Sequence, residues 1–425
     1  MLFLLRQFLV FLAYTITIVY TIWGIYHLIL FFYGLGEPFE PKNKSSLPKI
    51  SVIIPSRNEP ILGRTIETIV QHVDYPLNKK EIVVVTEDPL SERIAFWYQQ
   101  SYPNVVKLLM RKEFFPTKPS ALNDAFHFTT GDIVGIVDVE DILERDAFKK
   151  ISSAMEGHGF DIVQALLRIS NENDSWITKI FAMEYAGWFR IMLNGRSKLG
   201  LYTPLGGTGN YFRRNLIGYV GAWNPINLTE DAEITVRFVL AQRKVVVINV
   251  RQWEEAPVTF KAWLKQRTRW FRGWLQTLWS YSGLIFKPWA VRRIGFFTLF
   301  STIVMLIAPL LVVFNWVAYS LTIFWLLEAY DILHTRLMSG TFPSFAFFPL
   351  LFNFLYYLIW LYGAKLEKIG KKNYLYLPHM IFYMNFMMPL ASLRALYQEI
   401  FKPISWEKTE HPGRGVRWVV TEKNK

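Results

Sequence analysis

The chain of 425 residues contains no cysteine. This absence excludes disulfides, thiolate zinc sites, iron–sulfur ligation and a cysteine nucleophile. Acidic residues are also outnumbered, 34 against 47 basic ones, which gives a formal net charge of +13. Such an excess is typical of nucleic-acid binders and of membrane proteins, whose cytoplasmic loops are rich in lysine and arginine. Because 52% of the residues are hydrophobic and 17% aromatic, the chain is expected to fold or insert rather than stay disordered.

Long apolar runs are confined to the two ends of the chain. The first is Phe8–Tyr33, and three more lie at 296–327, 345–363 and 374–393. About twenty apolar residues span a bilayer, so each run is a candidate membrane helix. The first run is too long for a signal peptide and lacks a small-residue cleavage site. Between Lys49 and Val258 no run is long enough to span, so we expect one soluble domain between membrane anchors.

The loop at 364–372 carries four lysines, which favours the cytoplasmic side of the membrane. We therefore expect a multi-pass protein of the plasma membrane with its soluble domain in the cytoplasm. Four full spans would place the basic tail from Lys402 outside, which the charge rule disfavours. Either 374–393 is re-entrant or interfacial, or 296–327 bends strongly at Pro309, and the sequence leaves both possibilities open.

The soluble segment contains four short runs rich in β-branched residues: Ile50–Ile54, Glu81–Val85, Gly131–Val137 and Lys244–Val250. Runs that are apolar on both faces suit a parallel sheet covered by helices. Segments between them, such as Leu62–Val73 and Ser120–Phe128, have helical spacing and room for right-handed crossovers. The pattern predicts a doubly wound, mostly parallel α/β domain.

Polar or acidic side chains follow three of these runs. In open α/β sheets, ligands bind beyond the carboxyl ends of the strands. One cluster holds Asp138, Glu140 and Asp141, and like charges this close need a counter-ion. A hard cation such as Mg²⁺ or Mn²⁺ accepts carboxylate oxygens and leaves positions for phosphate. Capping of a following helix by Asp141 is a compatible structural alternative.

A second acidic group, at 227–233, opens a helical stretch. Thr229 can cap that helix, with acids in its first turn. The functional alternative makes one of these carboxylates a general base.

An Arg- and Trp-rich segment follows at 263–274. On a helix, Gln266, Arg269 and Trp270 share a face, where Arg269 can reach phosphate and Trp270 can stack on a sugar ring. The alternative is an amphipathic helix at the bilayer surface, with arginines on lipid phosphate and tryptophans in the aromatic belt.

Five motifs occur together in the order and spacing of a known family: Ser51–Glu59, Lys118–Asn123, Asp138–Asp141, Thr229–Asp231 and Gln266–Trp270. In these motifs the chain resembles membrane-integrated family-2 glycosyltransferases, which include the cellulose and hyaluronan synthases. Pro204–Asn210 and Trp406–His411 add a likeness to bacterial and archaeal cellulose-synthase-like enzymes. The resemblance covers roughly residues 45 to 412.

The resemblance implies a GT-A fold and an inverting, metal-dependent, processive enzyme. Its donor would be a nucleotide-diphosphate sugar, expected to be a UDP-sugar, and its product a β-linked polysaccharide. The implied site comprises donor contacts from Glu59, Asp88, Lys118, Asp138, Gln266 and Arg269, a metal site of Asp138 with Glu140 or Asp141, catalysis by the base Asp231 and by Glu230, and acceptor contacts from Gly206, Gly207, Thr208, Asn210 and Trp270.

The apolar runs, the loop charges and the motifs together divide the chain into five expected parts: a membrane helix (1–40), a GT-A domain (45–258), interfacial helices (259–290), a membrane region (291–400) and a basic cytoplasmic tail (401–425). The interfacial helices carry the Gln266–Trp270 motif. The membrane region is expected to hold about three spans. Partners are then the sugar donor, a growing glycan or lipid-linked acceptor, and the bilayer.

The chain departs from the family in two respects. Leu143 stands where the family often has proline, and the membrane part is smaller than in large polymer synthases, so secretion would need a partner or a dimer. A non-processive enzyme that adds one sugar to a lipid or lipid-linked acceptor is therefore the alternative. A transporter would need more ionisable groups within its spans than His27 and His379. Basic residues gathered by the membrane argue against a nucleic-acid partner.

Overall fold

The computed structural model describes residues 2–402 except 43–45, 113–116, 286, 331, 333, 335–336 and 339–343. The predictions for the tail, including the segment 406–411, and much of the loop at 331–341 lie outside the described residues.

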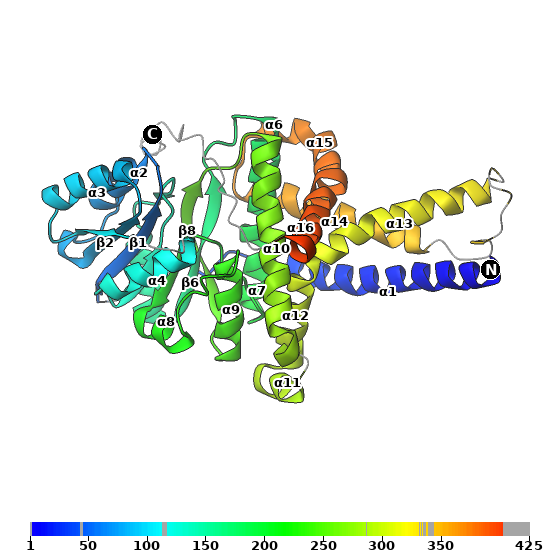
Figure 1. Ribbon diagram of the computed structural model, residues 1–425, viewed down its shortest axis with the longest axis horizontal. Coiled ribbons are helices and arrows are strands. Elements are labelled where there is room, and N and C mark those ends of the chain that lie inside the picture. Colours follow the sequence, from blue (N-terminus) through cyan, green and yellow to red (C-terminus); the bar gives the residue numbers. More distant parts are fainter. Residues whose placement is uncertain are drawn as a thin grey trace.

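Eight strands form one mixed sheet in the order β3-β2-β1-β4-β7-β6-β8-β5 (Figure 1). Their bounds are β1 Ile50–Ser56, β2 Lys80–Thr86, β3 Val106–Met110, β4 Ile133–Ile136, β5 Ile142–Leu143, β6 Ile162–Ile169, β7 Asn210–Arg213 and β8 Val245–Glu254. The β1–β2, β2–β3, β1–β4 and β6–β8 pairs are parallel, whereas β7 joins β4 and β6 antiparallel and β5 joins β8 antiparallel. The predicted doubly wound, mostly parallel sheet is confirmed, and the four predicted runs are β1, β2, β4 and β8.

Helices cover both faces of the sheet because successive strand residues point to opposite sides. On β1, Val52 and Ile54 belong to one core, with Leu62 of α2 and Phe148 of α5, whereas Ile53 belongs to the other. The helices of the two layers are α2 Leu62–Glu67, α3 Pro89–Ser101 and α5 Ala147–Ser152 on one face, and α4 Lys118–Phe128, α8 Arg214–Val220 and α9 Glu230–Leu240 on the other. The short π-helical segments η1 Thr68–His72 and η3 Ser153–Gly157 and the 3-10 helix η2 Leu77–Lys79 complete this part.

Two predicted helix caps are wrong. Asp141 precedes the strand β5, not a helix. Thr229 occupies the N-cap position of α9, but its side chain makes no capping hydrogen bond. Its N–H instead donates to Asn227 Oδ1 at 2.8 Å, so the turn before α9 is closed by asparagine.

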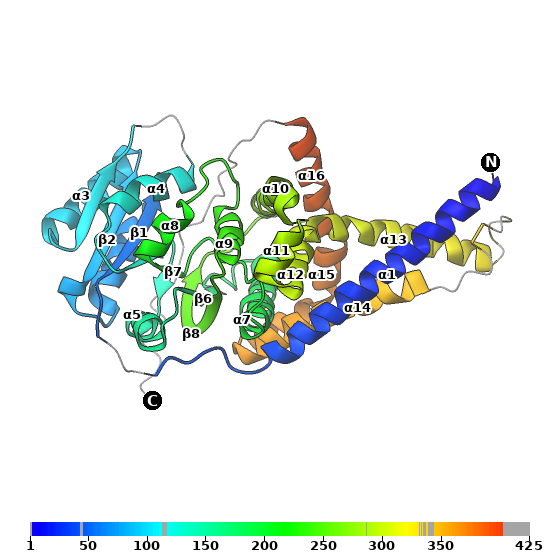
Figure 2. The same cartoon turned by 90° about the horizontal axis from the view of Figure 1, so that it is seen from below.

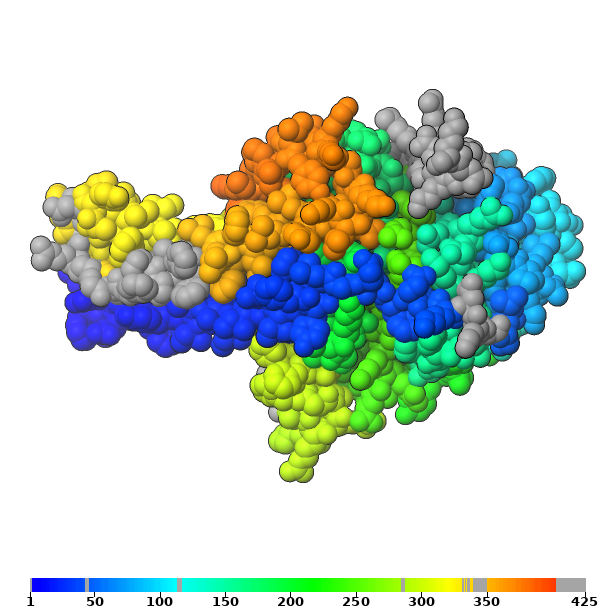
Figure 3. All heavy atoms as spheres, turned by 180° about the vertical axis from the view of Figure 1, so that it is seen from behind, coloured from blue at the N-terminus to red at the C-terminus, as the bar shows by residue number. Residues whose placement is uncertain are grey.

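The remaining helices form a second body beside the sheet. They are α1 Leu2–Gly34, α6 Trp176–Tyr185, η4 Ala186–Leu193, α7 Asn194–Lys198, α10 Phe260–Ile285, α11 Pro288–Ile294, α12 Phe296–Leu306, α13 Ala308–Ala329, α14 Ser344–Leu366, η5 Lys371–Tyr376, α15 Leu377–Phe382, η6 Tyr383–Met387 and α16 Met388–Phe401. Figures 1 and 2 show α1 and α13 projecting away from the sheet in the same direction. In Figure 3 the blue α1 runs along the orange α14 on the surface.

Among the described residues, α1 and α13 are long and apolar enough to cross a membrane. The pair α11 and α12, bent by 110°, passes the same test only if it counts as one broken span. The run 296–327 is not one continuous helix: α12 ends and α13 begins at Ile307, just before the Pro309 that lies in the first turn of α13. A break near Pro309 is one of the two possibilities that the sequence leaves open. The run 374–393 is divided among η5, α15, η6 and α16.

Two glycines let α1 pack closely on the segment that leads back to the sheet. A Cβ atom on Gly34 would lie 2.1 Å from the Ile191 carbonyl oxygen, and one on Gly195 would lie 2.3 Å from the Leu30 carbonyl oxygen. Only glycine fits at such contacts. The amino-terminal helix is thus fixed directly against η4 and α7.

Candidate active site

One cavity of about 420 Å³ begins at the carboxyl ends of β1, β2 and β4 and continues between the helices. It brings together most of the residues predicted from the sequence: Glu59, Lys118, Asp138, Glu140, Gly206, Gly207, Glu230, Asp231, Gln266, Arg269 and Trp270. Four predicted residues do not line it, namely Asp88, Asp141, Thr208 and Asn210. The volume suits a small-molecule ligand.

Lys118, in the first turn of α4, connects two loops across the cavity. Its Nζ lies 2.5 Å from Asp138 Oδ1 and donates to the Gly207 carbonyl oxygen at 2.9 Å. Burial alone would lower the pKa of Lys118, but the carboxylates of Asp138 and Glu230 raise it above its usual range. A Cβ on Gly207 would lie 3.7 Å from both Lys118 Nζ and Asp231 Oδ2. The missing side chain therefore leaves space between the lysine and the candidate base.

Asp141 faces the interior instead of the cavity. Its Oδ2 accepts hydrogen bonds from the Asp138 N–H at 2.6 Å, from Gln252 Nε2 at 2.7 Å and from the Thr208 hydroxyl. Burial, followed by the charges of Asp138 and Glu140, raises the pKa of Asp141 well above its usual range. In this arrangement Asp141 and Thr208 support the loop that presents Asp138; their predicted roles as metal and acceptor contacts stay predictions.

Asp138 and Glu140 are the acidic residues after β4 that face the cavity. Carboxylate oxygens are the donors that Mg²⁺ and Mn²⁺ take, with diphosphate and water completing the shell. No group of three or more His, Asp or Glu side chains arranged to hold a metal occurs in the described part of the chain. Two carboxylates beside an open space therefore fit an ion shared with a bound diphosphate, not one enclosed by protein.

Asp88 holds the loop after β1. Its Oδ1 accepts from the Ser91 N–H at 2.8 Å and caps α3, while its Oδ2 accepts from the Asn58 N–H at 2.7 Å. Burial raises the pKa of Asp88, but these hydrogen bonds outweigh it and lower the pKa. Asn58 has a φ of 54°, in a region that asparagine tolerates. Asp88 thereby fixes the turn from which Glu59 reaches the cavity.

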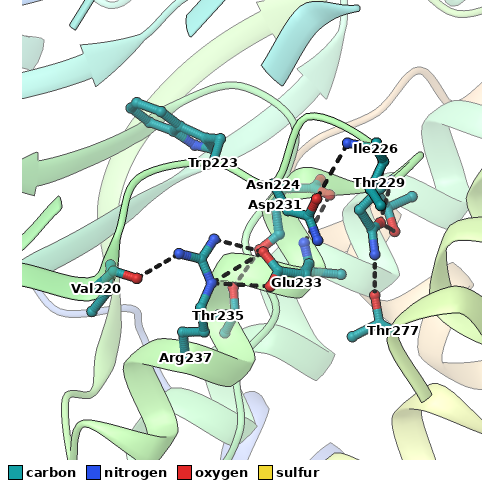
Figure 4. A network of polar contacts seen from close by, with 12 residues as sticks. Val220, Trp223, Asn224, Ile226, Thr229, Asp231, Glu233, Thr235, Arg237 and Thr277 are labelled. Carbon is teal, nitrogen blue, oxygen red and sulfur yellow. Dashed lines mark hydrogen bonds and ion pairs between the residues drawn. The ribbon is translucent and has the colours of Figure 1, made fainter. Parts of the chain in front are cut away.

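The start of α9 carries Glu230 and Asp231 into the cavity. Figure 4 shows the turns beneath them, where the Arg237 guanidinium bonds Glu233 at 2.6 Å and the Val220 carbonyl at 2.6 Å. Asp231 Oδ1 accepts from the Ala232 N–H at 2.8 Å. Burial raises the pKa of Asp231, and burial raises that of Glu230 to about 7 although Lys118 opposes it. Both carboxyl groups are therefore weaker acids than free ones.

The helix α10 supplies Gln266, Arg269 and Trp270 to the cavity, as their shared face predicts. Arg269 Nη1 lies 3.4 Å from the Leu228 carbonyl oxygen, in the loop before α9. Burial lowers the pKa of Arg269, but a guanidinium stays charged in a protein.

The neighbouring arginines of α10 form ion pairs with carboxylates of the protein. The interfacial alternative instead expects arginines of this helix to contact lipid phosphate. Arg267 pairs with Glu184 at 2.8 Å, and Arg272 pairs with Glu399 at 2.8 Å. The Arg267 guanidinium also lies 4.6 Å from the centre of the Trp270 ring. This face of α10 is packed inside the molecule.

Charged residues that sequence reasoning did not assign to the site also line the cavity, among them Glu87, Arg111 and Glu254. Arg111 holds Glu87 at 2.8 Å. Burial raises the pKa of Glu254 to about 8. Glu87 and Glu254 both lie at the carboxyl ends of strands. The same kind of position identified Asp138 as a candidate site residue from the sequence.

A further part of the cavity lies between helices, and we call it the helical chamber. It is lined by Trp23, His27, Arg196, Met305, Val312 and Tyr356. These residues come from five helices, α1, α7, α12, α13 and α14, and none belongs to a motif. The cavity thus runs from strand ends to side chains of the membrane-helix candidates α1 and α13.

The fold and this site define the class of GT-A glycosyltransferases. A family model described as glycosyltransferase like family 2 matches residues 48–273, more than half of the chain. The chain therefore belongs to this family of sugar-transferring enzymes, which use nucleotide sugars.

Curated relatives agree with this assignment over part of their length. A probable glycosyltransferase, YdaM, of Bacillus subtilis is 30% identical over 59% of this chain and 62% of its own. A beta-monoglucosyldiacylglycerol synthase of Synechocystis is 27% identical over 55% and 49%. A poly-beta-1,6-N-acetyl-D-glucosamine synthase of Staphylococcus epidermidis is 24% identical over 60% and 62%. The chain thus spans about half to three-fifths of these relatives.

A solved structure extends the likeness beyond the sheet. The mannosyltransferase PcManGT from Pyrobaculum calidifontis, in complex with GDP-Man and Mn²⁺, superposes with a TM-score of 0.60 at 17% identity. The match covers 92% of this chain and 99% of that one. The two proteins share a fold that includes the helices around the sheet.

Proposed function

We propose that the protein transfers a hexose, with inversion, from a nucleotide-diphosphate sugar to a hydroxyl of a lipid-linked acceptor at a membrane. The observation that carries this proposal is the single cavity that joins Asp138, Asp231 and Arg269 to the helical chamber. The residues that would bind the sugar donor lie at the end of the cavity next to the sheet. The other end is lined by side chains of the apolar helices α1 and α13, among others.

The donor end suits a diphosphate. Asp138 and Glu140 would hold Mn²⁺ or Mg²⁺, which when bound neutralises charge on the departing diphosphate. Lys118 lies on Asp138 and can bind phosphate oxygen, and Arg269 brings a second cation from α10. Fixed cations aimed at a leaving group lower the barrier without a general acid. Glu59, on the loop held by Asp88, would contact the nucleoside.

Asp231 is our proposed base. Asp231 and Lys118 lie on either side of the space next to Gly207. If the donor diphosphate binds Lys118, an acceptor hydroxyl that contacts Asp231 would face the donor sugar. Asp231 would remove the hydroxyl proton as the oxygen attacks the anomeric carbon, and attack from the side opposite the leaving group inverts that carbon. The carboxylate with a raised pKa is a better base than a free one.

Activity is expected to fall at low pH. A base acts only when unprotonated, so the rate is lost as pH falls through its pKa in the folded protein. Burial raises the pKa of Asp231, and its neighbour Glu230 has a pKa of about 7. We therefore expect the acid limb of kcat/KM above the range of an ordinary aspartate, which is about 4. A pH–rate profile with a limb at or below pH 4 would contradict this assignment.

Processive synthesis of a β-linked polysaccharide is the second candidate. Gln266, Arg269 and Trp270 line the cavity together, and an indole in the same cavity as the proposed base offers a surface on which a growing glycan can stack. A dimer or a secretion partner would then have to complete the export path. The catalytic domain would be cytoplasmic in either case.

Trp270→Ala separates these candidates. If a glycan stacks on Trp270, the variant makes shorter products and needs up to about tenfold more acceptor, since aromatic stacking contributes roughly 0.5–1.5 kcal/mol. Product length is measured by gel or mass spectrometry. Trp279→Ala is the matched control, because Trp279 lies on the same helix with 56% of its surface exposed. Equal products from both variants would leave Trp270 with a packing role only.

A donor panel tests the reaction itself. The full chain in lipid nanodiscs would receive UDP-glucose, UDP-N-acetylglucosamine, UDP-galactose or GDP-mannose with Mn²⁺ or Mg²⁺. One sugar added to a lipid-linked acceptor supports the main proposal, and a ladder or high polymer supports the second. No transfer from any donor, with or without metal, contradicts both.

A further inference from the structure

The helical chamber contains a buried cation that lacks a counter-ion, Arg196 of α7. It is 1% exposed and lines the cavity. Its Nη1 donates to Ser301 Oγ at 2.9 Å and to the Tyr202 carbonyl oxygen at 3.2 Å. Its Nε is buried and has no hydrogen-bond partner. Among the described residues no carboxylate forms an ion pair with it.

The other buried arginines are different. Four in the described part of the chain, Arg111, Arg190, Arg267 and Arg272, are each ion-paired with a carboxylate. A guanidinium stays charged when buried, and burial of a charge is costly unless it is paired. The Tyr26 ring lies 5.3 Å from the Arg196 guanidinium and offsets part of this cost, but it accepts no strong hydrogen bond. Arg196 therefore requires an anion.

A second donor in the chamber also has no acceptor. Trp23 Nε1 is buried without a hydrogen-bond partner, and Trp23 lines the same cavity. Trp23 comes from α1 and Arg196 from α7, two helices held together through Gly195. The other residues that define the chamber are His27, Met305, Val312 and Tyr356, of which Met305 and Val312 are wholly apolar. Two free donors in apolar surroundings fit an anionic group attached to an apolar chain.

Arg196 is also close to the proposed base. Tyr202, which is fully buried, accepts from Arg196 with its carbonyl oxygen and donates with its hydroxyl to the Ala232 carbonyl at 3.0 Å. Ala232 directly follows Asp231. One tyrosine therefore links the cation to the first turn of α9 through two hydrogen bonds.

We propose that the acceptor is a phosphate-bearing lipid, whose phosphate oxygens bind Arg196 and Trp23 while a sugar hydroxyl beyond the phosphate reaches Asp231. This inference rests on the sugar transfer proposed above and specifies its acceptor. A neutral lipid would leave the Arg196 charge unpaired, so the site selects against it. The chemistry recognised is a phosphate group, and its two sources, a lipid and free phosphate, are separated by experiment.

Binding of simple probes tests the proposal without turnover. The purified full chain in detergent would be saturated with nucleoside diphosphate and Mn²⁺, which fill the donor site. Decyl phosphate, decanol and inorganic phosphate would then be titrated against tryptophan fluorescence. We expect decyl phosphate to bind at least tenfold more tightly than either other probe. Equal binding of decanol would overturn the phosphate site, and equal binding of inorganic phosphate would overturn the lipid.

Variants assign the binding to Arg196. Arg196→Gln should weaken decyl phosphate binding about 10- to 100-fold, as expected for loss of charge-assisted hydrogen bonds, and Arg196→Lys should weaken it less. Arg190→Gln is the matched control, because Arg190 is equally buried but pairs with Glu37 at 2.9 Å. Wild-type affinity in a folded Arg196→Gln protein would overturn the proposal. Nucleoside diphosphate binding reports folding; if the glutamine variant does not fold, Arg196→Lys decides.

Ser301→Ala distinguishes a binding role from a structural one. It removes one acceptor of Arg196 Nη1 but leaves the cation, so decyl phosphate affinity should stay within about twofold of wild type. If Arg196 only braces α7 against α12, both Ser301→Ala and Arg196→Gln lower stability and neither changes the preference among probes. Decyl phosphate binding without sugar transfer would contradict the proposed function alone. Transfer that is equally fast to neutral and phosphate-linked acceptors would contradict this inference alone.

Discussion

Asp231→Asn is expected to lower kcat by about 10³-fold while leaving nucleotide binding intact. The amide has the same shape as the carboxylate but cannot take the acceptor proton, and a general base typically contributes 10²–10⁴-fold. The Ala232 N–H that now donates to Asp231 Oδ1 can donate to the amide oxygen, so α9 should still begin at Glu230. Transfer is measured with the preferred donor, and binding by titration of nucleoside diphosphate with Mn²⁺.

Asp161→Asn makes the same chemical change on the surface, where Asp161 pairs with Arg213 and Arg243. This control should keep wild-type kcat. If Asp231→Asn retains more than a tenth of the activity, Asp231 is not the base. Glu230, which lies beside it with a pKa of about 7, would then be the next residue to replace.

Local patterns predicted the part of the sheet at which the proposed donor end of the cavity lies. β1, β2, β4 and β8 are runs rich in β-branched residues, and the loop after β4 carries Asp138 and Glu140 to the cavity. β6 was missed because Gln164–Arg168 consists mostly of good helix formers. β7 has only four residues, Asn210–Arg213, and its antiparallel place between β4 and β6 depends on pairing between distant segments. Tertiary contacts, not propensity, decide both.

Sequence spacing does not say which way a loop side chain points. Asp138 and Asp141 belong to one acidic motif, yet Asp138 lines the cavity and Asp141 is buried behind it with Gln252. The sequence gave no indication that residues of the helical chamber lie together, because Trp23, Arg196 and Tyr356 are brought together only by packing of α1, α7 and α14. The motifs of the sequence identify the residues of the proposed donor site, whereas the proposed acceptor end is found only in the structure.

Glu184→Gln is expected to lower the free energy of unfolding by about 3–5 kcal/mol, the typical cost of leaving one charge of a buried pair unpaired. Glu184 of α6 accepts two hydrogen bonds from Arg267 of α10, each at 2.8 Å, and one from the Tyr383 hydroxyl of η6 at 2.6 Å. The glutamine can keep some of these hydrogen bonds, but the Arg267 charge remains buried without its counter-ion. Denaturant titration in detergent, followed by tryptophan fluorescence, measures the change.

Glu156→Gln is the matched control, since Glu156 pairs with Arg213 at 2.9 Å in a partly exposed position, where such pairs contribute about 0–1 kcal/mol. A further variant that combines Glu184→Leu with Arg267→Met should recover most of the lost stability, because it removes both charges together. A loss below about 1 kcal/mol for Glu184→Gln would mean that water or a nearby group compensates Arg267. The buried pair joins α6, α10 and η6, so its loss should also loosen the cavity wall that carries Trp270.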